Sequence, residues 1–193
     1  LVNIPSEDRK NALGSFALPK NIKKMQDDMA KYKIFYDKWF FESELHKSGA
    51  VKDVVDLLTK KGLTYEKEGA IWYKNKQVLT EKLLKEGKSQ KYIDNLELKD
   101  DVLIRQNGNP TYFTADIAYH KNKFDRGFTT LIDVWGADHH GHVMRMKGAM
   151  DAIGYDGNKL DVVLMQLVKL VRNGELVRMS KRTGKAIQLG DLL

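Results

Sequence analysis

Cysteine is absent from the 193-residue sequence, and proline occurs only three times. The absence of thiols excludes a disulfide framework, a thiolate zinc site, an iron–sulfur cluster and a cysteine nucleophile, and it suits a reducing compartment. No apolar run reaches the ~18–20 residues of a membrane-spanning helix. The first five residues show no basic-then-apolar signal pattern and no initiator methionine. We therefore expect a non-membrane chain that is part of a longer protein.

Three common nucleotide and hydrolase motifs are also missing. The sequence contains no G-x-x-x-x-G-K-[ST] loop, no G-x-G-x-x-G loop and no G-x-S-x-G elbow. These absences disfavour a P-loop enzyme, an NAD-dependent enzyme and an α/β-hydrolase.

Positive charge is in excess. The chain carries 33 Lys and Arg residues against 26 Asp and Glu residues, a formal charge of +7. Such a balance favours a polyanionic partner, either nucleic acid or a phosphorylated ligand. The alternative is an ordinary solvated surface, since charged residues of both signs make up 31% of the chain.

Helices and a hairpin are predicted for the first hundred residues. Residues 1–20 are polar and irregular, and apolar side chains at helical spacing predict a helix over 21–33. An aromatic group at 35–41 is typical of a core. A hairpin is predicted over 63–73, followed by one lysine-rich helix within 76–99 with Thr80 near its cap. We interpret residues 1–100 as a connecting or insertion sub-domain.

The pattern changes after residue 100. Strands predicted at 101–105, 131–135 and 162–168 alternate with helices at 111–121 and 143–153, and the last strand is of the buried type. Alternation of this kind predicts an α/β fold with a parallel sheet over residues 101–193. Ligands bind beyond the carboxyl ends of such strands. Asn173 and Gly174 predict a tight hairpin turn near the end.

The segment Gly136-Ala-Asp-His-His-Gly-His142 lies between a predicted strand and a predicted helix. Gly136 permits close approach of a ligand to the backbone, and the helix start offers free N–H groups. Asp138 can accept two hydroxyl hydrogen bonds from a ribose, and His139 can donate to a phosphate or a base. A helix-capping role for Asp138 and a metal site are the alternatives; the latter is disfavoured because neighbouring side chains in a turn diverge.

Two further segments could hold ligands. Tyr112 and Asp116 are four residues apart and share one side of a predicted helix, which suits a planar guanidinium unless Tyr112 packs in the core and Asp116 faces water. The stretch from Arg178 to Lys185 holds four cations interspersed with Ser, Thr and Gly. It suits either a polyphosphate or solvent.

Taken together, these segments resemble the arginyl-tRNA synthetases, which are class I aminoacyl-tRNA synthetases. Met179-Ser-Lys181 resembles the KMSKS signature, residues 136–142 resemble the G-x-D-Q-x-x-H segment, and Tyr112 to His120 resembles the bacterial arginine enzymes. The likeness is strong over about 30–73 and 101–193 and weak over 1–29 and 76–99.

The resemblance implies a partial Rossmann-like parallel sheet and a two-step reaction with L-arginine, ATP and tRNA(Arg). Tyr112 and Asp116 would then bind arginine, and Gly136, Asp138, His139 and Met179 would bind ATP or the adenylate. Lys181, with Ser180 and Arg178, would stabilise charge on the phosphates. Mg²⁺ would accompany ATP, with no tightly bound cofactor and no resident metal. The family is cytoplasmic and its full-length members are usually monomeric.

The sequence departs from the family pattern in two ways. Arg178 and Arg182 replace the first Lys and the last Ser of the signature, and neither the upstream HIGH motif nor the anticodon-binding helical domain is present. We therefore expect a central piece of the catalytic region that does not charge tRNA alone. The alternatives are a non-catalytic basic RNA-binding module and another class I-like nucleotidyltransferase.

Overall fold

The computed structural model describes residues 5–177, 187 and 189–192. Its contacts divide the chain into two compact units, residues 1–40 with 169–193 and residues 41–168. The domain boundary near residue 100 stays a prediction. Within the described part of the chain, no helix combines the length and the apolar character that crossing a bilayer requires.

The first unit contains one long helix and a small hairpin. Helix α1 spans Ser6–Lys31, and the two-residue strands β6 (Val171–Arg172) and β7 (Glu175–Leu176) pair antiparallel. Asn173 and Gly174 both have positive φ in the turn between the strands, which confirms the predicted hairpin. A final short helix, η4 (Leu189–Leu192), contacts α1 through a hydrogen bond from the Tyr32 hydroxyl to the Leu189 carbonyl.

The prediction of an irregular segment over 1–20 was wrong. Helix α1 begins at Ser6 and continues through Pro19. Its described side chains are largely exposed, including Phe16 and Leu18, so no apolar stripe marks the first half. Proline lacks only its own N–H and can be accommodated within a helix at a cost.

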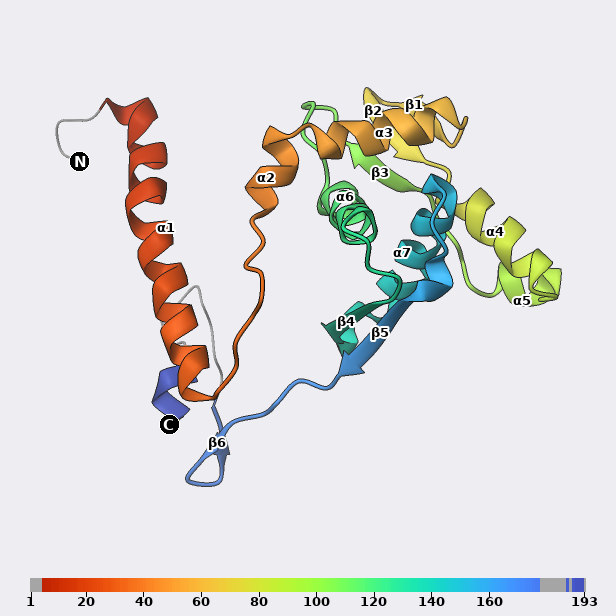
Figure 1. The fold of residues 1–193 in the computed structure, drawn as a ribbon. Coiled ribbons are helices and arrows are strands. Elements are labelled where there is room, and N and C mark those ends of the chain that lie inside the picture. Colours follow the sequence, from red (N-terminus) through yellow and green to blue (C-terminus); the bar gives the residue numbers. More distant parts are fainter. Residues whose placement is uncertain (1–4, 178–186, 188, 193) are drawn as a thin grey trace. The chain divides into compact units, whose positions relative to one another are not determined.

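The second unit holds the other elements (Figure 1). In chain order these are α2 (Glu42–Lys47), α3 (Ala50–Lys60), β1 (Thr64–Lys67), β2 (Ala70–Tyr73), α4 (Asn75–Lys85), α5 (Gln90–Asp94), β3 (Asp101–Ile104), α6 (Tyr112–Asp125), β4 (Leu131–Gly136), η1 (Ala137–His139), α7 (His140–Ile153), η2 (Gly157–Lys159) and β5 (Leu160–Met165).

Two small sheets occur in this unit. Strands β1, β2 and β3 form an antiparallel sheet in that order, and β4 pairs parallel with β5. The predicted strand at 101–105 is therefore present as β3, but it extends the hairpin and does not join the parallel strands. The connection through α4 and α5 returns the chain alongside β2 in the opposite direction.

Helix α6 contacts the antiparallel sheet, and helix α7 contacts the parallel pair. Helix α6 contacts α2, α3, α7 and β3, while α7 also contacts α3, α4 and β5. Their apolar sides meet in a core whose fully buried members are Val54, Leu58, Tyr73, Leu79, Leu103, Ile117, Met146, Met150 and Leu160. Strand β4 leads through the short turn η1 into α7, so the start of α7 lies near the carboxyl end of β4.

Three further predictions need correction. Strand β5 is not of the buried type, since Val163, Leu164 and Met165 are 42–54% exposed. The lysine-rich helix of 76–99 is two helices, with Thr80 inside α4 and Ser89 capping α5. The aromatic group at 35–41 is not a core, because Phe35 is 76% exposed. In each case the residue types alone predicted burial or a helix end, and both depend on the tertiary packing.

Candidate functional site

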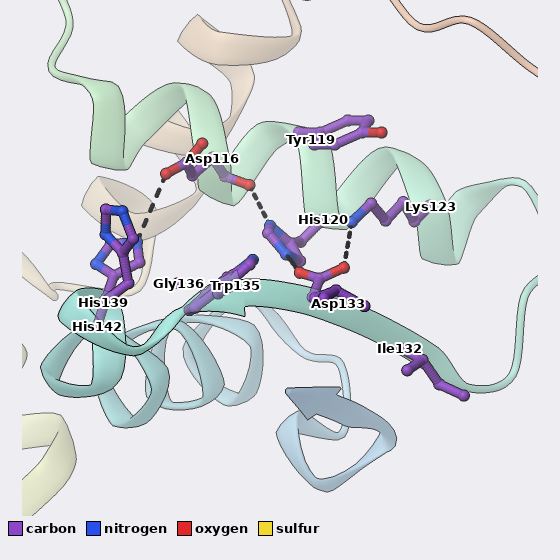
Figure 2. A pocket seen from close by; sticks show the side chains of 11 residues that line it. Asp116, Tyr119, His120, Lys123, Ile132, Asp133, Trp135, Gly136, His139 and His142 are labelled. Carbon is purple, nitrogen blue, oxygen red and sulfur yellow. Dashed lines mark hydrogen bonds and ion pairs between the residues drawn. The ribbon is translucent and has the colours of Figure 1, made fainter. Parts of the chain in front are cut away.

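A cavity of about 480 Å³ lies between α6 and β4 and continues to the start of α7. Figure 2 shows its lining side chains coming from these elements. It extends to the carboxyl end of a parallel strand, where α/β folds bind ligands. The lining residues are Asp116, Tyr119, His120, Lys123, Ile132, Asp133, Val134, Trp135, Gly136, His139 and His142.

Helix α6 contributes one carboxylate to the cavity, that of Asp116. The Thr111 side chain caps the helix by accepting a hydrogen bond from the Thr114 N–H at 3.4 Å. One turn further on, the Asp116 carboxylate lines the cavity with half of its surface exposed, and Oδ2 lies 3.5 Å from Nε2 of His142. Tyr112 is 80% exposed and is not among the lining residues. Of the predicted pair, only Asp116 therefore faces the cavity.

The turn after β4 forms the opposite end. Strand β4 ends at Gly136, residues 137–139 form one 3₁₀ turn, and α7 follows, which confirms the predicted strand–turn–helix order. A Cβ atom at position 136 would overlap the Asp138 carboxylate. Glycine therefore permits the carboxylate of Asp138 to fold back over the backbone.

Gly136 and His139 line the cavity, and Asp138 lies beside them. The side chains of Asp138 and His139 are both about two-thirds exposed, with Oδ2 and Nε2 3.8 Å apart. Both groups are therefore accessible to a ligand.

A buried polar network forms the remaining wall, and sequence reasoning missed it. His120 and Asp133 are 4% and 8% exposed. Nε2 of His120 lies 2.5 Å from Oδ2 of Asp133, and Lys123 Nζ donates to Oδ1 at 2.7 Å. Burial acts to raise the pKa of Asp133, but the hydrogen bonds from His120 and Lys123 outweigh it and hold that pKa below its ordinary value. The sequence contains one signal for this network: Asp133 is a carboxylate that alternates with exposed residues on β4 and shares the inward side with the apolar Leu131.

A metal site has no support within the described ranges. No group of three or more His, Asp or Glu side chains there could hold a metal ion. Of the three histidines of the 136–142 segment, His139 and His142 line the cavity, whereas Nδ1 of His140 lies 3.3 Å from the carbonyl oxygen of Ala137.

Four of the residues predicted to bind ATP or to stabilise charge on its phosphates belong to the basic stretch near the end of the chain. Arg178, Met179, Ser180 and Lys181 lie outside the described residues. The site as described therefore comprises Asp116, Gly136, His139 and the buried network, with Tyr112 and Asp138 nearby in the sequence.

Known proteins are similar to this chain in sequence and in fold. No family model matches the chain. It is 55% identical over 192 residues to an arginine–tRNA ligase of Caldanaerobacter subterraneus subsp. tengcongensis, and 52% identical over 193 residues to one of Ruminiclostridium cellulolyticum. These matches cover 99% and 100% of this chain, and the chain spans 31% of each relative.

Two solved structures are also similar. An arginyl-tRNA synthetase structure from Campylobacter jejuni matches 97% of the chain and 37% of its own length, with 32% identity and a TM-score of 0.77. The arginyl-tRNA synthetase of Thermus thermophilus matches 83% of the chain and 32% of its own length, with 17% identity and a TM-score of 0.63. The second likeness concerns the fold alone.

Proposed function

The chain belongs to the arginine–tRNA ligase family as one segment of such a protein, and from this premise we propose that it supplies part of the catalytic centre. The whole protein would activate L-arginine with ATP to arginyl-adenylate and then transfer the arginyl group to tRNA(Arg). A free-standing RNA-binding module and another nucleotidyltransferase are not favoured, because the relatives named above are all arginine enzymes.

The observation that carries the proposal is the carboxylate of Asp116 in a cavity that reaches the carboxyl end of β4. A guanidinium group needs a carboxylate that accepts two parallel hydrogen bonds, and an aromatic face adds a stacking surface. Asp116 would supply the carboxylate. The ring of Tyr112, one turn earlier on α6, is exposed and outside the cavity lining, so it would have to reorient to stack on the bound arginine.

The ATP subsite would lie at the turn between β4 and α7. The carboxylate of Asp138 lies over the backbone of Gly136, and Asp138 and His139 present exposed polar groups to the ligand. Asp138 would accept hydrogen bonds from the ribose hydroxyls, and His139 would hold the adenosine end.

The phosphates would be held by the basic stretch near the end of the chain. Lys181 would stabilise negative charge that develops between the α-phosphate and the departing pyrophosphate, with Ser180 and Arg178 in support and Met179 beside the adenine. Mg²⁺ would enter as part of the ATP complex, since the described residues offer no cluster of carboxylates to hold it.

The chemistry of activation requires positioning and charge stabilisation more than a general base. A carboxylate oxygen of arginine forms a bond to the α-phosphorus while the bond to the pyrophosphate oxygen breaks. A ribose hydroxyl of tRNA then attacks the arginyl carbonyl carbon, loses its proton and displaces AMP.

We also infer that β4, α7 and β5 belong to a Rossmann-like sheet. The parallel pairing of β4 with β5 across the intervening α7 is a βαβ unit, which supports this inference. Residues 1–100 would form the connecting sub-domain of the same catalytic region.

Substitution of Asp116 tests the arginine subsite. In the full-length ligase that contains this segment, Asp116→Asn should raise the KM for arginine by at least about a hundredfold, because the amide oxygen can accept only one of the two guanidinium hydrogen bonds and carries no charge. The KM for ATP should change by less than about threefold. Steady-state pyrophosphate exchange with each substrate varied in turn measures both values.

Asp125→Asn is the matched control. Asp125 lies on the same helix and accepts from Lys121 at 2.6 Å, but it does not line the cavity. Its KM for arginine should equal that of the wild type. Equal effects of Asp116→Asn on the arginine and ATP KM values would refute the assignment.

A further inference from the structure

His120 lies between two hydrogen-bond acceptors. Its Nδ1 is 2.7 Å from the backbone carbonyl oxygen of Asp116, and its Nε2 is 2.5 Å from Oδ2 of Asp133. A carbonyl oxygen can only accept, so Nδ1 must donate to it. A second proton must lie between Nε2 and the carboxylate. The imidazole therefore joins one turn of α6 to strand β4 through two hydrogen bonds (Figure 2).

The strand end of this connection is itself held firmly. Oδ1 of Asp133 accepts from Lys123, which lies on α6 one turn beyond His120. Both carboxylate oxygens are thus occupied by donors from the same helix, and Asp133 is 8% exposed. The carboxylate has little freedom to turn away.

The carboxylate of Asp116 lies beside a second histidine, with no hydrogen bond between them. Its Oδ2 lies 3.5 Å from Nε2 of His142 on α7. The His142 ring is 5.4 Å from that of Trp135, and the Trp135 ring is 6.3 Å from that of His120. The backbone of Asp116 is therefore tied to β4 through His120, while its carboxylate lies close to the start of α7.

Packing alone does not explain a buried His–Asp–Lys network. Apolar residues of similar volume often replace buried ion pairs without loss of stability. Directional hydrogen bonds, in contrast, fix the rotation of a helix about its axis and its distance from a strand. We propose that His120 is a positioning residue for arginine: through Asp133 it fixes the helical turn that carries the Asp116 carboxylate relative to the Gly136 turn. This inference deepens the proposed function and rests on the assignment of Asp116 to the arginine subsite.

Two substitutions at position 133 separate the hydrogen bonds from the rest of the packing: asparagine keeps the size of aspartate, and leucine keeps its branch at Cγ but is larger and apolar. Asp133→Asn can donate its amide N–H to a neutral His120 Nε2 and accept from Lys123, so both connections persist. Asp133→Leu removes both. In the full-length ligase, Asp133→Leu should raise the arginine KM about tenfold, as for one lost charge-assisted hydrogen bond, with the ATP KM within about twofold. Asp133→Asn should keep the arginine KM within about threefold of wild type.

A second variant covers the case in which Asp133→Leu does not fold. His120→Gln has an amide that reaches Asp133, but no donor at the position of Nδ1, so it breaks only the bond to the Asp116 carbonyl. We expect the same selective rise in arginine KM. Asp125→Leu is the matched control, since it also removes a carboxylate paired with a lysine of α6; its KM values should not change.

Equal arginine KM values for Asp133→Leu and Asp133→Asn would overturn the positioning role, and so would parallel changes in the arginine and ATP KM values. Asp116→Asn, measured alongside, distinguishes the two proposals. A large effect of Asp116→Asn without one for Asp133→Leu or His120→Gln refutes the positioning role alone. No effect of Asp116→Asn refutes the arginine subsite itself.

Discussion

At the scale of single residues, the charge of the buried Asp133 carboxylate contributes to stability. Burial opposes its ionisation, yet two donors from α6 hold its pKa below the ordinary value. The folded state therefore binds the proton less readily than the unfolded state. By linkage, the carboxylate stabilises the fold above the unfolded-state pKa of about 3.9, and this contribution is lost as the pH falls through the lower folded-state value.

This linkage predicts the pH dependence of an Asp133→Asn variant. At pH 7 the substitution should lower the free energy of unfolding by about 1 kcal/mol, because neutral hydrogen bonds replace charged ones. The difference from wild type should shrink below about pH 4. Urea denaturation followed by circular dichroism between pH 3 and 7 measures it.

The half-exposed carboxylate of Asp125, which accepts from Lys121 and Tyr155, is the comparison. Asp125→Asn should change stability less, because solvent screens exposed pairs. A difference for Asp133→Asn that stays constant down to pH 3 would contradict the linkage.

At the scale of elements, the approach of α7 to α4 depends on one small residue. A Cβ atom at Gly148 would lie 2.6 Å from Cδ2 of Leu79, which is fully buried. Glycine is a poor helix former, so its presence inside α7 reflects this close approach.

A double-mutant cycle tests the contact. Gly148→Ala should destabilise the protein by about 1–3 kcal/mol through overpacking. In a Leu79→Ala background, the same change should be neutral or stabilising by up to ~1 kcal/mol, since only helix propensity then acts. Free energies of unfolding from urea titration give the coupling. Additive effects of the two substitutions would show no coupling between positions 148 and 79, and would contradict the predicted overpacking.

At the scale of the whole molecule, the site is open. Tyr112 is 80% exposed and the Asp116 carboxylate is half exposed. On the parallel pair, Ile132 and Val134 of β4 are each 67% exposed. Stabilising the negative charge that develops on the phosphates needs a site from which water is excluded. The relatives are about three times as long as this chain.

We therefore expect the 193-residue chain alone not to charge tRNA(Arg). The measurement is incorporation of labelled arginine into tRNA at enzyme concentrations up to micromolar, with a full-length ligase as the positive control. Robust arginylation by the chain alone would contradict this expectation. It would show that the described elements already exclude water sufficiently.

Local sequence signals determined several elements and part of the site. Residues that are neighbours in the chain predicted the Asn173-Gly174 turn, the start of α6 close to Thr111, and the order of β4, turn and α7. The same holds for Gly136 and His139, whose place after a strand predicted their position at its carboxyl end. The spacing of four residues predicted that Tyr112 and Asp116 share one side of a helix. Of the two, only Asp116 lines the cavity, and its role in binding arginine stays a prediction.

Only the tertiary structure decided which of these groups face one cavity. Tyr112 turned outward, β3 paired with the hairpin, and β5 remained exposed. The network of His120, Lys123 and Asp133 joins residues that are 10 and 13 positions apart on different elements. No local pattern encodes that contact, because it depends on the rotation of α6 against β4. That rotation is set by the packing of the whole second unit.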